Sequence, residues 1–280
     1  MTIEGADVDV LLDGVVFGES PRWHDGRLWF SDWGANQVIA LTADGGHEVV
    51  ATVDSFPMCI DFLPDGRLLV VDSARKRLLR REPDGSLVDH ADLSPASRTM
   101  WNDIVVDGRG NAYVNSIGFD FPAGEYAPGL IARVTPEGTV TRVADDLAFP
   151  NGMAISPDGT TLVVAESYAN RLTAYDIDGG LRNRRVWADT PGDHPDGICF
   201  DAEGAIWYAD VGNRHCVRVR EGGEVLATVG FDRGAFACVL SRGDDPRLFV
   251  VGQEWGGPEG SPPSGRVWAF PAPAPGAGRP

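Results

Sequence analysis

Four side chains with oxygen ligands occupy matched places along the chain. Asn102, Asn151 and Asp196 each lie eight residues before a glycine that marks a recurring turn, and Glu19 lies seven before its own. Carboxylate and amide oxygens are the ligands that hard divalent cations prefer, and two carboxylates neutralise such an ion. The set has no cysteine and only His194 nearby, which disfavours a structural zinc site. The alternative is that Asn and Asp merely begin strands after turns, since FPNG and HPDG are good turn sequences.

The elements that must position these residues are short repeats of a turn, a glycine, an apolar run and an acid. The spacings between successive markers are 40, 44, 49 and 45 residues, and a degenerate sixth copy starts at Asp244. This period, built from short strands, is typical of the blades of a β-propeller. The five marker glycines are Gly26, Gly66, Gly110, Gly159 and Gly204.

We therefore expect an all-β chain that forms a six-bladed β-propeller with four antiparallel strands per blade. Residues 1–270 form a single propeller, and the segment from Val8 to Gly14 supplies the outer strand that closes the last blade. The Pro-, Gly- and Ala-rich residues 271–280 are expected to be a disordered tail. Inner strands begin at the central channel, so the four oxygen-bearing side chains should converge at one mouth of it.

Two further groups of residues are expected to be structural. An acid recurs at the end of the second strand in four blades, where its side chain can bond neighbouring amides; these acids are Asp32, Asp72, Glu166 and Asp210. The four cysteines show no metal-type spacing and lie in apolar runs, which predicts small core residues; they are Cys59, Cys199, Cys216 and Cys238.

Charge and composition exclude several classes of function. The formal net charge is −17 and the isoelectric point about 4.6, which argues against nucleic acid as a partner. The sequence shows no signal-peptide pattern and no run of about 20 apolar residues, so we expect no membrane association. These features predict a cytoplasmic monomer that acts on a small molecule.

The chain resembles a known family, the regucalcin, gluconolactonase and luciferin-regenerating-enzyme group of six-bladed propellers. Members of this group are senescence marker protein-like lactonases. The resemblance rests on GESPRW, WND, FPNGMAISPDG and HPDGICFDAEG, and it spans essentially the whole chain. It implies that Glu19, Asn151 and Asp196 bind one divalent metal ion. It also implies that Asn102 contacts the substrate and that Asp196 is the general base.

Departures from the family pattern bear on the substrate. Where sugar-lactone members often carry an arginine, this chain has Met100, next to Trp101, which predicts a less polar substrate. Asp120 fits an acidic substrate contact by spacing alone, and His194 is either a substrate-side proton donor or a partner in a turn hydrogen bond. A long insertion in the third blade forms either a pocket wall or a loop packed on its own aromatic residues, Phe119, Phe121 and Tyr126.

The sequence thus predicts a metal-dependent, gluconolactonase-like lactonase. Metal polarisation of the lactone carbonyl precedes attack by water, with Asp196 and Asn102 as catalytic residues. Calcium is the favoured cation, while zinc, magnesium, manganese and ferrous iron also suit oxygen ligands. Two alternatives remain open: a hydrolase of phosphotriesters or other esters on the same cage, and a propeller that binds calcium or a small molecule without turnover.

Overall fold

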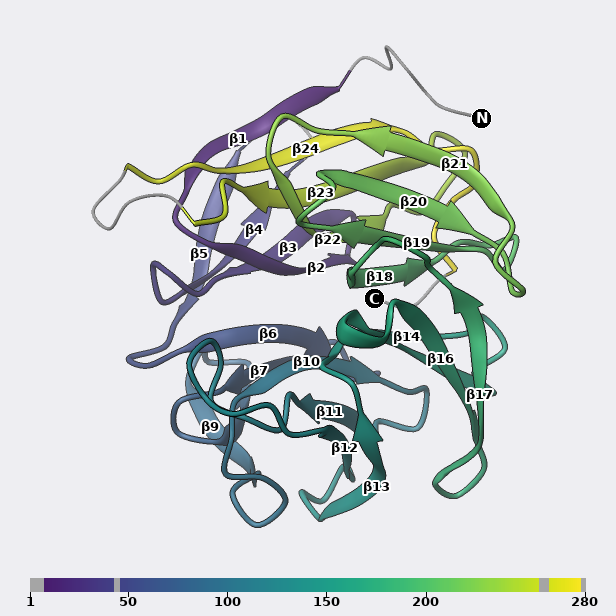
Figure 1. The fold of residues 1–280 in the computed structure, drawn as a ribbon. Coiled ribbons are helices and arrows are strands. Elements are labelled where there is room, and N and C mark those ends of the chain that lie inside the picture. Colours follow the sequence, from purple (N-terminus) through teal and green to yellow (C-terminus); the bar gives the residue numbers. More distant parts are fainter. Residues whose placement is uncertain (1–7, 43–45, 257–261, 278–280) are drawn as a thin grey trace.

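The computed structural model describes residues 8–42, 46–256 and 262–277. Within them the chain forms six four-stranded antiparallel sheets, which are the blades of a propeller, and one short 3-10 helix (Figure 1). The predicted fold class is confirmed. Among these residues, no helix has the length and apolar character needed to span a membrane.

Each blade runs from an inner strand to an outer strand in the order of the chain, except the last. Blade 1 contains β2 (Gly18–His24), β3 (Arg27–Asp32), β4 (Gln37–Leu41) and β5 (His47–Thr52). Blade 2 contains β6 (Pro57–Phe62), β7 (Leu68–Asp72), β8 (Arg77–Arg81) and β9 (Leu87–Asp92). Blade 3 contains β10 (Trp101–Val106), β11 (Ala112–Ser116), β12 (Gly129–Val134) and β13 (Val140–Leu147).

The remaining blades follow the same pattern. Blade 4 contains β14 (Pro150–Ile155), β15 (Thr161–Glu166), the helix η1 (Ser167–Ala169), β16 (Arg171–Ile177) and β17 (Leu181–Asp189). Blade 5 contains β18 (Pro195–Phe200), β19 (Ile206–Asp210), β20 (His215–Val219) and β21 (Val225–Gly230). Blade 6 contains β22 (Gly234–Leu240), β23 (Arg247–Gln253), β24 (Gly265–Pro271) and the N-terminal β1 (Asp9–Val15).

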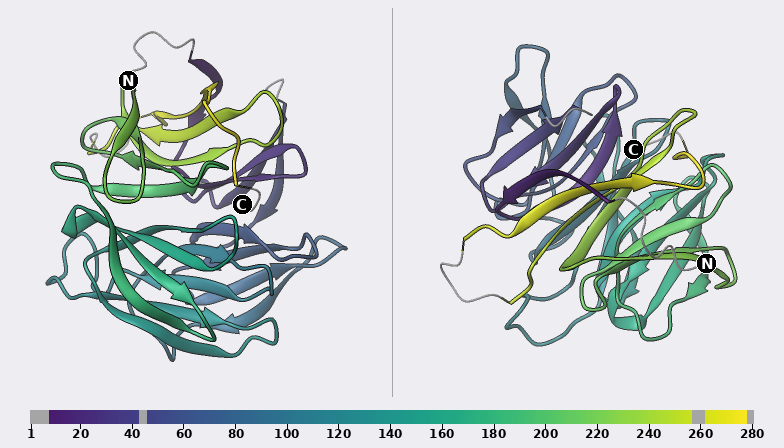
Figure 2. Two further views of the ribbon diagram at one scale, coloured as in Figure 1. Left: turned by 90° about the vertical axis from the view of Figure 1, so that its right-hand side faces the viewer. Right: turned by 90° about the horizontal axis from the view of Figure 1, so that it is seen from above.

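The first strand of the chain closes the ring. β1 pairs antiparallel with β24, from Asp9 opposite Ala269 to Val15 opposite Gly265 (Figures 1 and 2). The first and last strands therefore lie in one sheet, as predicted from the apolar segment before the first repeat. Pairing of the terminal strands leaves the last blade with its full set of four and covers an edge that would otherwise be open.

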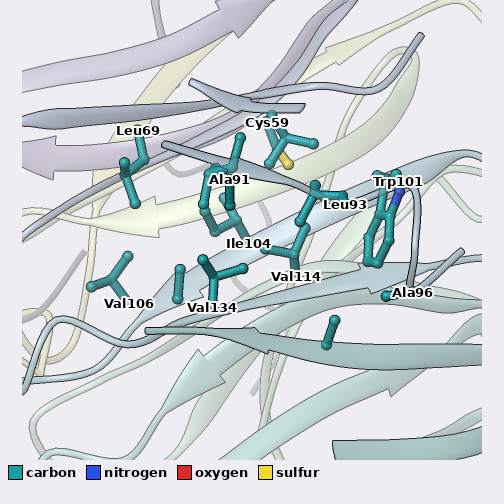
Figure 3. Close-up of a cluster of buried hydrophobic side chains, with 14 of the residues drawn as sticks. Cys59, Leu69, Ala91, Leu93, Ala96, Trp101, Ile104, Val106, Val114 and Val134 are labelled. Atoms are coloured by element: carbon teal, nitrogen blue, oxygen red, sulfur yellow. The ribbon is translucent and has the colours of Figure 1, made fainter. Parts of the chain in front are cut away.

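The apolar core is divided among the contacts between blades. Six clusters of buried side chains each join two neighbouring blades, so apolar packing runs around the whole ring. Figure 3 shows the cluster between blades 2 and 3, where Trp101 and Leu93 are fully buried. All four cysteines are free thiols, and each lies in or against one of the clusters, as expected for small core residues.

The recurring acids have the predicted structural role. Asp32 accepts hydrogen bonds from the amides of Val16 (3.0 Å) and Phe17 (2.8 Å), which immediately precede the inner strand β2. Asp210 accepts one from the amide of His194 (2.7 Å), just before β18. Because these carboxylates are almost fully buried, each one fixes the loop that delivers the chain to an inner strand.

The C-terminal segment differs from its prediction. Residues 272–277 are not a disordered tail, because their backbone is hydrogen-bonded to blades 5 and 6. The amide of Gly276 donates to the carbonyl of Ser241 (2.8 Å), and the amide of Ala277 donates to the carbonyl of Phe200 (3.1 Å). Composition alone indicated disorder, but main-chain groups can be satisfied whatever the side chains. Residues 278–280 lie outside the described residues.

Candidate functional site

Four inner strands place the predicted oxygen ligands together. Glu19 comes from β2, Asn102 from β10, Asn151 from β14 and Asp196 from β18, and all four line one cavity at the centre of the ring. Met58, the matched residue of blade 2, lines the same cavity. Equivalent positions of the repeats therefore lie together in the fold, although they are up to 177 positions apart in the chain.

A local irregularity at the start of each inner strand frees these side chains from the regular ladder. The register with the second strand shifts between Glu19 and Arg22, and likewise across the segments that hold Asn102, Asn151 and Asp196. Such bulges redirect side chains and are common beside functional sites. Asn151 and Asp196 are the second residues of strands β14 and β18, so both begin strands as the alternative expects, and both also line the cavity.

The glycines that follow Asn151 and Asp196 have a steric purpose. A Cβ atom on Gly152 would lie 2.5 Å from the carbonyl oxygen of Asp196, and one on Gly197 would lie 2.2 Å from the Cβ of Ala237. The inner strands of blades 4, 5 and 6 therefore approach backbone to backbone, which only glycine permits. This close approach brings Asn151 next to Asp196.

Hydrogen bonds connect the amides of the site. Asn102 Nδ2 donates to Asn151 Oδ1 at 3.0 Å, and Asn151 Nδ2 donates to Ser167 Oγ at 3.3 Å. Ser167 Oγ in turn donates to the carbonyl of Pro195 at 2.8 Å. The chain of contacts links blades 3, 4 and 5 and holds both asparagine side chains in one orientation.

The two carboxyl groups carry the electrostatic signature of a cation site. Burial raises the pKa of Glu19 to about 8, and the nearby Asp103 carboxylate adds to this shift. Burial also raises the pKa of Asp196 well above its usual range, with the Glu19 carboxylate as the next contribution. Two carboxylates that oppose each other's ionisation, with amide oxygens beside them, are stabilised together by one divalent cation. The donor set of Glu19, Asn151 and Asp196 therefore fits such an ion.

We call Glu19, Asn102, Asn151 and Asp196 the floor of the cavity. The cavity above this floor has a volume of about 780 Å³, and its walls are predominantly apolar. Met100 is part of the wall, as predicted. Most of the other wall residues were not identified from the sequence, because they lie in the connections between strands, where the repeat gives no register. The aromatic members of the wall are Phe17, Trp33, Phe56, Phe121, Phe149, Tyr168, Phe236 and Trp255.

His194 lines the cavity and is anchored at both its backbone and its ring. Its amide donates to Asp210, and its Nδ1 lies 2.9 Å from the carbonyl oxygen of Ser167. The same Nδ1 lies 3.2 Å from Nδ2 of Asn170, so two polar contacts hold the ring. His194 therefore makes the turn-side hydrogen bonds of one alternative and also lines the cavity, while its role as a proton donor stays a prediction.

Two predicted substrate contacts do not belong to the cavity. Trp101 is fully buried in the cluster between blades 2 and 3 (Figure 3), because side chains alternate along a strand and Met100 and Asn102 take the opposite side. Asp120 is exposed in the blade 3 insertion and is not among the residues that line the cavity. Its prediction depended on spacing in an irregular loop, where spacing does not determine direction.

The blade 3 insertion both forms part of the pocket wall and packs on its own aromatic residues, which were the two alternatives from the sequence. Phe121 forms part of the cavity wall. Phe119 is buried and contacts the rings of Phe121, Tyr126 and Phe149 at centroid distances of 6.2, 5.7 and 5.8 Å. The loop thus packs on its own aromatic residues and presents one of them to the cavity.

An ion cluster beneath the floor was missed by sequence reasoning. The buried guanidinium of Arg22 lies 3.6 Å from Asp61 and 3.4 Å from Asp103, and it donates to the carbonyl of Ile104 at 2.6 Å. Asp103 also accepts from the amide of Met153 at 2.6 Å. The cluster ties the inner strands of four blades together. All three charged residues lie on inner strands, and charged residues in these otherwise buried strands were the feature of the sequence that could have predicted the cluster.

A second group of potential ligands lies in blade 5. Asp193, Asp210 and His215 have ligand atoms within 4.8 Å of one another. Their oxygens already accept from other groups: Tyr208 Oη at 2.5 Å and Asn213 Nδ2 at 2.8 Å for Asp193, and main-chain amides for Asp210. This group is accounted for as a structural cluster that supports the loop before β18.

Comparisons with known proteins agree with the fold. The chain is 29% identical over 251 residues to a pentonolactonase of Haloferax volcanii, covering 86% of this chain and 78% of that protein. It is 32% identical over 173 residues to a diisopropyl-fluorophosphatase of Loligo vulgaris, an alignment that covers only 54% of each. A solved gluconolactonase from Xanthomonas campestris superposes with a TM-score of 0.81 at 26% identity, covering 97% of this chain and 91% of that one.

The family assignment follows from the extent of the match. The pattern described as the SMP-30/Gluconolactonase/LRE-like region matches residues 17–253, which include all four oxygen-bearing residues of the site. The chain therefore belongs to the SMP-30/gluconolactonase/LRE-like family.

Proposed function

We propose that this protein is a hydrolase that opens a lactone with the help of one divalent cation held by Glu19, Asn151 and Asp196. The observation that carries the proposal is the pairing of two carboxyl groups with raised pKa values and two hydrogen-bonded amides at the floor of a large cavity. Relatives named as lactonases add support. When bound, the cation supplies Lewis-acid polarisation of the carbonyl and of a water molecule.

The side chains then have distinct tasks. Asp196 accepts a proton from the attacking water, whose oxygen forms the new bond to the carbonyl carbon. The ring C–O bond breaks, and the ring oxygen takes up a proton and leaves as a hydroxyl, so the product is a hydroxy acid. Asn102 is oriented by its bonds to Asn151 and the Pro150 carbonyl and positions the substrate. Met100 and His194 contact the substrate from the wall.

The test is hydrolysis of a lactone panel by protein stripped of metal, with calcium, magnesium, manganese, zinc and ferrous iron restored separately. We expect turnover to need a cation and to be lost in Asp196→Ala. A matched control is Asp193→Asn, which alters the structural acidic cluster of blade 5 and should retain turnover. Cation binding without turnover on any lactone or ester would favour the non-catalytic alternative.

A second candidate is hydrolysis of phosphotriesters on the same cage. It is favoured by the similarity to a diisopropyl-fluorophosphatase, although that alignment covers about half of either chain. The same ligands would serve both reactions, because a phosphoryl oxygen and a carbonyl oxygen are polarised in the same way. Inclusion of a fluorophosphate in the panel separates the two candidates by their relative kcat/KM.

A further inference from the structure

The walls of the cavity have a chemical character that the floor does not determine. Eight aromatic side chains line it, seven from connections between strands and one, Phe236, from β22, together with Met58, Met100 and Ile117. Three aromatic rings are in contact on the side of blades 1 and 2: Phe17 stacks on Trp33 at a centroid distance of 3.8 Å, and Phe56 lies tilted against Trp33 at 4.6 Å. Phe149 stacks on Tyr168 at 4.7 Å on the opposite side.

Polar groups able to serve a polyol are few on these walls. Beyond the floor, the polar or charged lining residues are Ser167, His194, Arg214, Asp232, Arg233 and Glu254. Ser167 is already bonded to Asn151 and to the Pro195 carbonyl. The guanidinium of Arg233 is bonded to Asp232 and to the Ser264 carbonyl. A substrate with a hydroxyl on every ring carbon would find partners at His194, Arg214, Asp232 and Glu254 but would lose hydrogen bonds to water along the aromatic walls, which costs affinity.

We infer that the substrate is a lactone, or a related ester, that carries an alkyl or aryl substituent rather than a sugar lactone. This inference rests on the proposed function and names the substrate class of the same site. The carbonyl group lies at the polar floor, and the apolar substituent lies between the two aromatic walls. A cavity of about 780 Å³ is in the range that encloses ligands of drug size, so it has room for a substituent larger than a six-membered ring.

The rim of the cavity continues the apolar character. Tyr168 and Trp255 line the cavity and remain 51% and 57% exposed, so their apolar surface is available to a ligand. Tyr126 lies 6.0 Å from Tyr168, is 50% exposed, and does not line the cavity. These two tyrosines are therefore a matched pair that differ in access to the cavity.

The experiment measures kcat/KM for a series of γ-lactones from γ-butyrolactone to γ-decanolactone, with γ-ribonolactone as the polyol of the same ring size. We expect kcat/KM to rise about fourfold per methylene group, the factor that corresponds to moving a methylene out of water. γ-Ribonolactone should be the poorest substrate. A flat or falling series, or preference for γ-ribonolactone, would overturn the inference while leaving the lactonase proposal intact.

Variants locate the effect in the walls. Tyr168→Ala is expected to lower kcat/KM for γ-decanolactone about fivefold more than for γ-butyrolactone, because only the long substituent reaches the wall. Tyr126→Ala should leave both substrates within about twofold. Equal losses on both substrates in Tyr168→Ala would contradict the assignment. No turnover of any lactone with any cation would instead refute the proposed function, so the two failures are distinguishable.

Discussion

A divalent cation should stabilise the fold itself, because its ligands come from three different blades. Glu19, Asn151 and Asp196 belong to strands β2, β14 and β18, so an ion that binds all three joins blades 1, 4 and 5 at the centre of the ring. A ligand that binds only the folded state stabilises it by about 2.7 kcal/mol at one hundred times its Kd. The perturbation is therefore the addition of cation to protein stripped with a chelator.

The size of the effect follows from the length of the chain. With an unfolding entropy of about 2.1 cal/mol/K per residue, the 280 residues give about 0.6 kcal/mol per kelvin. A stabilisation of about 2.7 kcal/mol then raises Tm by about 4 to 5 K.

The Asp196→Asn variant should reverse the order of stabilities. Without cation, the variant removes a buried carboxyl group whose ionisation is opposed by burial and by the Glu19 carboxylate, which is a cost that the stripped wild type carries. Relief of one pKa unit is about 1.4 kcal/mol, so the stripped variant should melt about 2 K above the stripped wild type. With cation present the wild type should melt about 2 to 3 K above the variant, since the variant has lost a charged ligand.

Differential scanning calorimetry at pH 8 measures both differences. Asp193→Asn is the control, because it alters the other acidic cluster and should keep the full cation shift even if its absolute Tm falls. The reasoning is refuted if Asp196→Asn and the wild type gain the same shift from every cation tested, or if the shift disappears in Asp193→Asn.

Three further predictions concern the structure around the site. Arg22→Met should lower the free energy of unfolding by about 3 to 5 kcal/mol in urea titrations, because it leaves two buried aspartates without their cation; a loss below about 1 kcal/mol would contradict this. Gly197→Ala should cost at least about 1 to 3 kcal/mol and weaken the cation shift, since the new methyl meets the backbone of blade 6, whereas Gly230→Ala, in open space, should do neither. His215 forms an ion pair with Asp193 at 3.1 Å, which raises the pKa of His215. The stabilisation of the fold by this ion pair is complete below the unfolded-state pKa of histidine, about 6.5, and is lost as pH rises through the pKa of His215 in the folded protein. His215→Gln should therefore destabilise the protein more at pH 6 than at pH 9 in the same titrations, and equal losses would be inconsistent with the ion pair.

The repeat made the blades and the floor of the site predictable. Glycines that mark equivalent turns define equivalent positions, and Glu19, Asn102, Asn151 and Asp196 were identified as departures from the repeat at those positions. The structure gathers all four at one cavity. Closure by β1 was predictable as well, because the last blade lacked a strand and the N-terminal apolar segment lacked a blade.

The walls were not predictable in the same way. Trp33, Phe236 and Trp255 reach the cavity from connections or strand starts whose side-chain directions depend on tertiary packing. Trp101 was assigned to the pocket by its neighbours in sequence, although alternation along the strand directs it into the core. Local spacing determines direction only within a regular strand, which is why the prediction for Asp120 in an irregular loop also failed.

Among the residues that the structure describes, the tunnel below the site narrows to two spaces of about 20 Å³ each, each with room for about one water; Arg22 lines both of them and Ala277 lines one. This narrowing determines how the protein exchanges its ligands. Within the described part of the chain, substrate and product share the wide mouth between the aromatic walls. A ring-opened product keeps the same apolar substituent and must leave before the next substrate can enter. Accumulating product should then act as a competitive inhibitor, and progress curves should slow well before substrate is exhausted.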